Sequence, residues 1–160
     1  MVVRSARHDD IPAIMALHER CWRISYAGLA DADAKFARPA SERMRLWEEL
    51  LPRTWVVLAG DEAVAGFVVT GPSRDADAPE RTGEIYALYV DPDRQGSGYG
   101  AALVERARAE LAGEGFSRVT LWTFQHNPAS RGFYERLGFL HDGTETSDED
   151  GAIVRYVVEL

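Results

Sequence analysis

Three glycines at alternate positions form the strongest candidate binding element in this sequence. Gly96, Gly98 and Gly100 lead into a helical pattern that continues to Ala112. Glycine tolerates left-handed backbone angles, so such a turn can point its amide groups outward and approach a ligand closely. The first turn of the helix adds unbonded N–H groups and a partial positive charge. The turn therefore suits a diphosphate group, although glycines that only relieve crowding would show the same spacing.

Two common phosphate-binding motifs fit this turn poorly. A P-loop has Lys followed by Ser or Thr after its last glycine, whereas Gly100 is followed by Ala101 and Ala102. A dinucleotide-binding turn has the spacing G-x-G-x-x-G, and here the third glycine comes one residue early. Nucleotide hydrolysis is therefore poorly supported, and a Rossmann-type nucleotide-binding enzyme is a weaker alternative.

The segment Gln95-Gly96-Ser97-Gly98-Tyr99-Gly100 resembles the Q/R-x-x-G-x-G/A motif of the GNAT superfamily of N-acetyltransferases. In that family a strand precedes the motif, and here Val90-Asp91-Pro92 ends one. The family usually carries an asparagine after the next strand and then a short helix with a tyrosine. This sequence has Asn127 and Tyr134 at those places. The resemblance is strongest from about Glu84 to Phe139.

The resemblance implies acetyl-CoA as the co-substrate. In the family, two splayed parallel strands flank the pantetheine arm, and the glycine turn holds the pyrophosphate. Backbone groups of Leu88 to Val90 would then pair with the pantetheine. The residues expected to bind the cofactor are Leu88, Tyr89, Val90, Gln95, Gly96, Ser97, Gly98, Tyr99, Gly100 and Asn127.

Transfer of an acyl group from a thioester to an amine needs a neutral nucleophile and a donor for the developing oxyanion. It also needs a proton source for the thiolate. The resemblance implies that Tyr134 is this general acid, whereas spacing alone favours an aromatic packed beside Phe133 and Phe139. In some family members a glutamate at the position of Glu84 removes the proton of the amine. A carboxylate at a strand end is otherwise a solvated surface group.

Two further tyrosines are candidate substrate-binding residues. Side chains alternate along a strand, so Tyr86 shares a face with Glu84 and can line the acceptor site or replace Glu84 as the base. Water is the third alternative for the base. The resemblance places the early helical region in the acceptor wall, and a helix break at Ala27-Gly28 would expose Tyr26.

The residue pattern predicts the elements that position these residues. Helices are expected with apolar residues recurring from Ile11 to Cys21, and over Ser41–Leu51, Gly98–Ala112 and Ala129–Leu137. Strands are expected over Thr54–Ala59, Val64–Thr70, Glu84–Val90, Val119–Phe124, Phe139–His141 and Ala152–Glu159. Strand, glycine turn, helix and strand form a βαβ unit with parallel strands. We therefore expect one α/β domain over residues 1–160, with a mixed, partly antiparallel sheet and flanking helices.

Composition narrows the class of partner. Lys and Arg together number 18 against 26 acidic residues, and the net charge of -8 argues against binding to nucleic acid or an anionic membrane. Two acidic stretches, Asp75 to Glu80 and Asp142 to Asp150, are typical of solvated loops. The single cysteine, Cys21, excludes an internal disulfide, and no Cys/His spacing indicates a metal site. No apolar stretch is long enough to cross a bilayer, so a cytoplasmic protein is expected.

The sequence therefore predicts an acyltransferase that moves an acetyl group from acetyl-CoA to a primary amine by direct attack in a ternary complex. The acceptor amine is not identified by the sequence, although the negative charge favours a cationic one. The alternative is a non-catalytic acyl-CoA-binding sensor or interaction module, because a fold does not fix a function. A homodimer is common among proteins that resemble this sequence.

Overall fold

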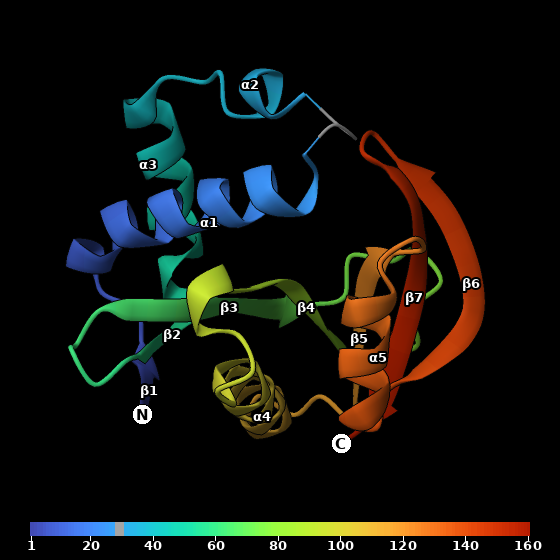
Figure 1. Cartoon of the computed structure of the whole chain (residues 1–160). Coiled ribbons are helices and arrows are strands. Elements are labelled where there is room, and N and C mark those ends of the chain that lie inside the picture. Colours follow the sequence, from blue (N-terminus) through green and yellow to red (C-terminus); the bar gives the residue numbers. More distant parts are fainter. Residues whose placement is uncertain (28–30) are drawn as a thin grey trace. The chain divides into compact units, whose positions relative to one another are not determined.

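The computed structural model describes residues 1–27 and 31–160 (Figure 1). Its α-helices are α1 (Ile11–Ser25), α2 (Ala32–Lys35), α3 (Ala40–Leu50), α4 (Tyr99–Gly113) and α5 (Pro128–Arg136), with short 3-10 turns at His8–Asp10, Leu51–Arg53 and Pro92–Arg94. Its strands are β1 (Val2–Ser5), β2 (Thr54–Leu58), β3 (Val64–Pro72), β4 (Thr82–Val90), β5 (Arg118–Phe124), β6 (Leu140–Asp148) and β7 (Gly151–Glu159).

The strands form a mixed sheet in the order β1-β2-β3-β4-β5-β7-β6. β4 and β5 are parallel, with Thr82–Ile85 registered on Arg118–Leu121, and the pairs β1 with β2, β2 with β3, β5 with β7, and β6 with β7 are antiparallel. The predicted fold class and its parallel βαβ unit are confirmed. By its contacts the chain divides into two compact units, residues 1–69 with 87–106 (unit 1) and residues 70–86 with 107–160 (unit 2). The single-domain assignment stays a prediction.

Unit 1 has helices on both faces of its strands. Gly66 and Phe67 are neighbours on β3, so they face opposite sides of the sheet. The Phe67 ring lies 5.2 Å from Trp47 of α3 and 6.2 Å from His18 of α1, so α1 and α3 cover this face. A Cβ atom on Gly66 would stand 3.1 Å from Leu103, so α4 covers the other face at a close approach that glycine permits.

His18 is held as a neutral imidazole in this aromatic cluster. Its ring makes edge contacts with Phe36, Trp47, Phe67 and Tyr89, with 4.9 Å between the centroids of His18 and Tyr89. Burial lowers its pKa from 6.5 to about 4, and the neighbouring cations Lys35 and Arg43 act in the same direction, against an opposite effect of Glu19. His18 is therefore harder to protonate in the folded protein than in the unfolded chain.

We expect this histidine to make folding sensitive to acid. Its folded pKa is depressed, so its contribution is fully present above pH 6.5 and is lost as pH falls through 6.5 toward about 4. The loss amounts to about 3 kcal/mol at most. His18→Phe keeps an aromatic ring at this position but cannot titrate. Denaturant unfolding at pH 7 and pH 4 should show a smaller acid loss in H18F than in the unaltered protein. Equal losses would contradict the expectation.

Unit 2 also has two distinct faces. A Cβ atom on Gly83 of β4 would stand 2.8 Å from Leu111 of α4, and the hydroxyls of Thr123 on β5 and Ser130 on α5 are 2.8 Å apart. The second half of α4 and α5 therefore cover this face, and Figure 1 shows α5 alongside β5. The opposite face carries Glu84, next to Gly83 on β4, and is covered by the segment that joins β3 to β4.

Three elements differ from the predictions. β6 continues through the predicted acidic turn as far as Asp148, so the stretch from Asp142 is mostly strand and not loop. Asp and Glu have low strand propensity, but β6 pairs with β7 and its side chains are nearly all exposed, so charged residues are tolerated there. β1 and α2, four residues each, were not predicted because such short segments show no clear periodicity. None of the described helices has the length and apolar character needed to cross a bilayer.

Candidate active site

The glycine turn in unit 1 has the geometry of an exposed anion cradle. Gly96 and Gly98 have φ angles of 78° and 82°, in the left-handed region that favours glycine. A Cβ atom on Gly96 would meet nothing within 4 Å, and one on Gly98 would meet only Met1 Cε at 3.8 Å. The glycines are therefore required by backbone angle and not by crowding. They lead directly into α4 at Tyr99, whose first-turn N–H groups complete the cradle.

Ion pairs anchor the segment just before this turn. Asp91 accepts a hydrogen bond of 2.5 Å from Arg20 of α1, and the same guanidinium donates to Asp93 at 2.6 Å. Arg94 reaches the turn between β2 and β3, where its Nη2 lies 2.9 Å from Asp61 Oδ2. The anchors join separate elements of unit 1, so they limit how far the start of the glycine turn can move.

The last residues of β4 present backbone groups away from β3. A Cβ on Gly66 of β3 would stand 2.8 Å from the Tyr89 carbonyl oxygen, and the Asp91 N–H donates to the Ala65 carbonyl at 2.8 Å. Backbone groups of successive strand residues point to opposite sides, so those of Leu88 and Val90 point away from β3. This is the orientation that pairing with an extended ligand needs.

Cys21 is a buried thiol and not a nucleophile. Its Sγ donates to the Val90 carbonyl oxygen at 3.4 Å. Burial raises the pKa of the Cys21 thiol to about 11, and the charge of Asp91 acts in the same direction, so the reactive thiolate is scarce at neutral pH. This geometry therefore gives no support to Cys21 as a nucleophile.

Glu84, the candidate base, is buried in unit 2 and not solvated. Its side chain is 2% exposed. The backbone N–H of Arg74 donates to Oε2 at 2.8 Å, and the guanidinium of Arg74 donates to Oε1 through Nη2 at 2.6 Å and Nε at 3.2 Å. Sequence reasoning missed Arg74, because it treated the segment from Gly71 to Gly83 only as a break between strands. Arg74 and Glu84 are ten positions apart, and no local sequence pattern predicts that they pair.

Tyr86 lies beside Glu84 in the same cluster. Its hydroxyl donates to the Pro72 carbonyl oxygen at 2.6 Å, and the Arg74 guanidinium lies 4.0 Å from its ring centroid. A Cβ on Gly71 would stand 2.3 Å from the Tyr86 hydroxyl oxygen, so the ring can lie here only over glycine. Because the phenol proton is directed at a carbonyl, Tyr86 is placed as a donor. The choice of base among Glu84, Tyr86 and water stays a prediction.

Asn127 and Tyr134 belong to α5. Asn127 Oδ1 accepts from the Ser130 N–H at 3.0 Å, so its side chain caps the helix. The Tyr134 side chain is buried, with its ring 5.1 Å from Phe133 and 5.7 Å from Phe139. The packed aromatic expected from spacing alone is therefore present. The roles of Tyr134 as general acid and of Asn127 as a cofactor ligand stay predictions.

Tyr26 lies just past the end of α1, half-buried, with its ring 4.6 Å from Trp22. Trp22 is itself buried. Gly28 of the predicted helix break lies outside the described residues. Substrate contact by Tyr26 stays a prediction.

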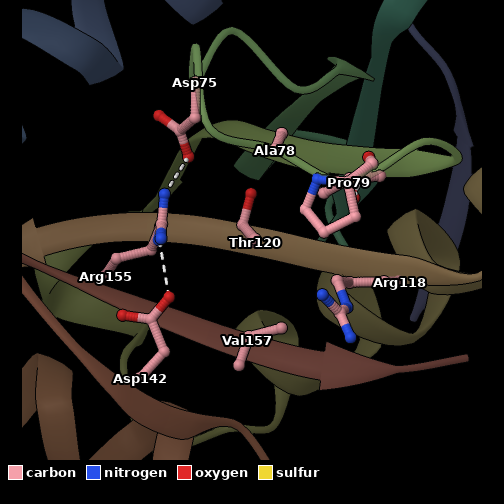
Figure 2. Close-up of a pocket in the computed structure, with 9 residues that line it drawn as sticks. Asp75, Ala78, Pro79, Arg118, Thr120, Asp142, Arg155 and Val157 are labelled. Atoms are coloured by element: carbon pink, nitrogen blue, oxygen red, sulfur yellow. Dashed lines mark hydrogen bonds and ion pairs between the residues drawn. The ribbon is translucent and has the colours of Figure 1, made fainter.

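A pocket of about 270 Å³ lies in unit 2, and it contains none of the predicted site residues (Figure 2). Arg155 of β7 lies between Asp75 and Asp142, at 3.2 Å and 2.6 Å, and also donates to Asp77 at 2.7 Å. The two acidic stretches therefore contribute carboxylates to one partly buried arginine instead of being wholly solvated. Among residues 1–27 and 31–160, no group of three or more His, Cys, Asp or Glu side chains could hold a metal ion.

Comparisons with known proteins point to one family. The model of the acetyltransferase (GNAT) family matches residues 11–139. The chain is 31% identical to a probable N-acetyltransferase of Mycobacterium tuberculosis over 150 residues, which cover 88% of this chain and 80% of that protein. It is 29% identical to a peptidyl-lysine N-acetyltransferase of Salmonella typhimurium over 93% of this chain and 90% of that protein.

The fold has counterparts among solved structures. The structure of a putative acetyltransferase from Salmonella typhimurium with acetyl-CoA superposes with a TM-score of 0.78, at 22% identity, over 100% of this chain and 94% of that chain. At this level of identity the likeness concerns the fold alone.

Proposed function

The chain belongs to the acetyltransferase (GNAT) family, and we propose that it transfers an acetyl group from acetyl-CoA to a primary amine by direct attack in a ternary complex. The observation that carries the proposal is the open glycine turn at the start of α4, with two left-handed glycines and free space above them. A diphosphate is the group that such a turn fits best. The expected cytoplasmic location and homodimer stay predictions.

The glycine turn and the last residues of β4 bind the donor in this proposal. Backbone N–H groups from Gly96 to Gly100 hold the pyrophosphate, assisted by Gln95 and Ser97. The backbone groups of Leu88 and Val90, which point away from β3, pair with the pantetheine amides. Bound acetyl-CoA supplies the activated thioester, and the chain supplies its position and the proton transfers.

The two candidate catalytic residues move protons in this proposal. Glu84 takes a proton from the attacking amine, directly or through water, as the N–C bond forms. Tyr134 gives its phenol proton to the departing sulfur as the C–S bond breaks. The raised pKa of the Cys21 thiol supports direct attack, because an acetyl-cysteine intermediate needs a thiolate.

We expect Gly98→Ala to weaken CoA binding. A side chain at a φ of 82° is strained by roughly 1–2 kcal/mol, and the new methyl group would occupy the open space over the turn. Calorimetric titration with CoA should show an affinity about 10-fold lower than that of the unaltered protein. Gly113→Ala is the matched control, since Gly113 closes the same helix with open space around it and no positive φ. Equal affinities of G98A and G113A would contradict the proposed cradle.

A thiol-release assay with acetyl-CoA tests the proposed reaction. The amine panel includes spermidine, free amino acids, an aminoglycoside, a lysine-containing peptide and a peptide with a free N-terminus. Amine-dependent thiol release supports the transferase and identifies the acceptor class. Binding of acetyl-CoA without thiol release for any amine would favour the non-catalytic sensor instead. Selective binding of a dinucleotide over CoA would favour the Rossmann-type alternative.

A further inference from the structure

Arg74 makes every hydrogen bond that the Glu84 carboxylate accepts from the described residues. Two come from its guanidinium to Oε1, at 2.6 Å and 3.2 Å, and one comes from its backbone N–H to Oε2, at 2.8 Å. A carboxylate that is 2% exposed has lost most of its contact with water, so it needs hydrogen-bond donors from the protein. Arg74 supplies these donors to Glu84.

The three hydrogen bonds also fix which lone pair of Glu84 stays available. A carboxylate has about four acceptor positions, two on each oxygen. The guanidinium fills both positions on Oε1, and the backbone N–H fills one on Oε2. One acceptor position on Oε2 is left for an amine N–H or a bridging water.

Arg74 is itself held in a defined place. Its guanidinium lies 4.0 Å from the Tyr86 ring centroid, a stacking distance that adds a cation–π interaction. The ring is fixed in turn by the hydrogen bond from its hydroxyl to the Pro72 carbonyl and by its close packing over Gly71. The Tyr86 ring therefore packs against the Arg74 guanidinium, and the Glu84 carboxylate accepts the hydrogen bonds of the same guanidinium.

We propose that Arg74 is a positioning residue for acetyl transfer, which fixes the Glu84 carboxylate so that the open position of Oε2 is presented to the amine. This inference rests on the proposed function and on Glu84 as its base. Arg74 acts through Glu84 and touches no reacting atom. Its loss should therefore lower kcat without changing the KM for acetyl-CoA.

A double-mutant cycle with Arg74→Met and Glu84→Gln tests the proposal. The assay is thiol release with acetyl-CoA and the panel amine that gives the unaltered protein its highest rate. R74M is expected to lower kcat by about 10- to 100-fold, and E84Q by about 100-fold. The acetyl-CoA KM should stay within about two-fold in R74M. The R74M/E84Q double variant should match E84Q alone, because the arginine has no role once the base is gone.

Two further variants separate positioning from general damage to the fold. Arg81→Met is the matched control in the same segment, where the side chain donates to the Gly115 carbonyl and not to Glu84. It should leave kcat unchanged. Arg74→Lys keeps the charge and the backbone N–H bond but not the fork of two donors, so its kcat should lie between those of R74M and the unaltered protein. If R74M does not fold, R74K replaces it in the cycle.

The possible outcomes separate a failure of the proposed function from a failure of the role of Arg74. An unaltered protein that releases no thiol with any amine overturns the proposed function together with this inference. An active protein in which R74M leaves kcat unchanged overturns the role of Arg74 alone. The role of Arg74 is also overturned if the fold-loss of kcat in the double variant equals the product of the losses in R74M and E84Q. Independent losses of this kind would show that Arg74 does not act through Glu84.

Discussion

Replacing Tyr134 with phenylalanine is expected to lower kcat by about 100-fold or more, the size of effect that general acid catalysis supplies. The variant removes only the hydroxyl, and the ring contacts with Phe133 and Phe139 do not depend on it. Acetyl-CoA affinity should therefore change little, and thermal unfolding shows whether the fold is kept. Steady-state kinetics with the best panel amine, together with CoA titration and thermal unfolding, measures all three quantities.

The pattern of effects in Y134F is more informative than the size of any one. A fall in kcat with an unchanged CoA affinity is the result expected for a proton donor to the departing thiolate. A kcat equal to that of the unaltered protein would mean that Tyr134 is the packed aromatic residue that its spacing suggests and nothing more. Lower stability with an unchanged kcat would lead to the same conclusion.

Replacing Arg155 with methionine is expected to destabilise the protein by about 3 kcal/mol. The side chain is 11% exposed and forms ion pairs with Asp75, Asp77 and Asp142, so its removal leaves the partly buried carboxylates of Asp75 and Asp142 without a cationic partner. The hydrogen bond to Asp77 is the main cause that raises the pKa of Arg155 above its usual range, and the arginine stays charged throughout. The melting temperature should fall by roughly 6 to 12 °C.

Arg118→Met is the matched control for this experiment. Arg118 lines the same pocket and pairs with Glu159 at 2.7 Å, but the Glu159 side chain is 66% exposed, and such a pair contributes about 1 kcal/mol at most. R118M should therefore melt close to the unaltered protein. Equal melting temperatures for R155M and R118M would show that the Arg155 network does not hold unit 2 together.

The donor half of the site could be predicted because its information is local. The motif from Gln95 to Gly100 is contiguous, and glycine spacing followed by a helical pattern specifies both the turn and the helix start. The structure confirms the turn, with left-handed angles at Gly96 and Gly98. The strands on either side were predictable for the same reason, since alternation over a few residues is enough to identify a strand.

The surroundings of the catalytic candidates could not be predicted, because they join distant residues. Glu84 was expected to be either the base or a solvated strand-end group, and the structure shows that it is buried and paired with Arg74 from the preceding segment. The pair of Arg155 with Asp75 spans 80 positions, and no local pattern links them. Asn127 shows a third case, because the same side chain that suggests a ligand contact also caps α5.

These differences change how the catalytic candidates should be compared. The hydroxyl of Tyr86 donates to a backbone carbonyl, while Glu84 retains one open acceptor position on a charged oxygen. Because the Glu84 carboxylate is held by three hydrogen bonds from Arg74, any role of Glu84 as the base would involve both residues.

The most direct test of acetyl transfer is to identify both products of one reaction. The protein is incubated with acetyl-CoA and the best panel amine, free thiol is measured, and the amine is analysed by mass spectrometry. The account predicts one acetyl group on the amine for each thiol released, and a large loss of both products in Y134F. Thiol release without an acetylated amine, or acetyl-CoA binding without either product, would contradict it.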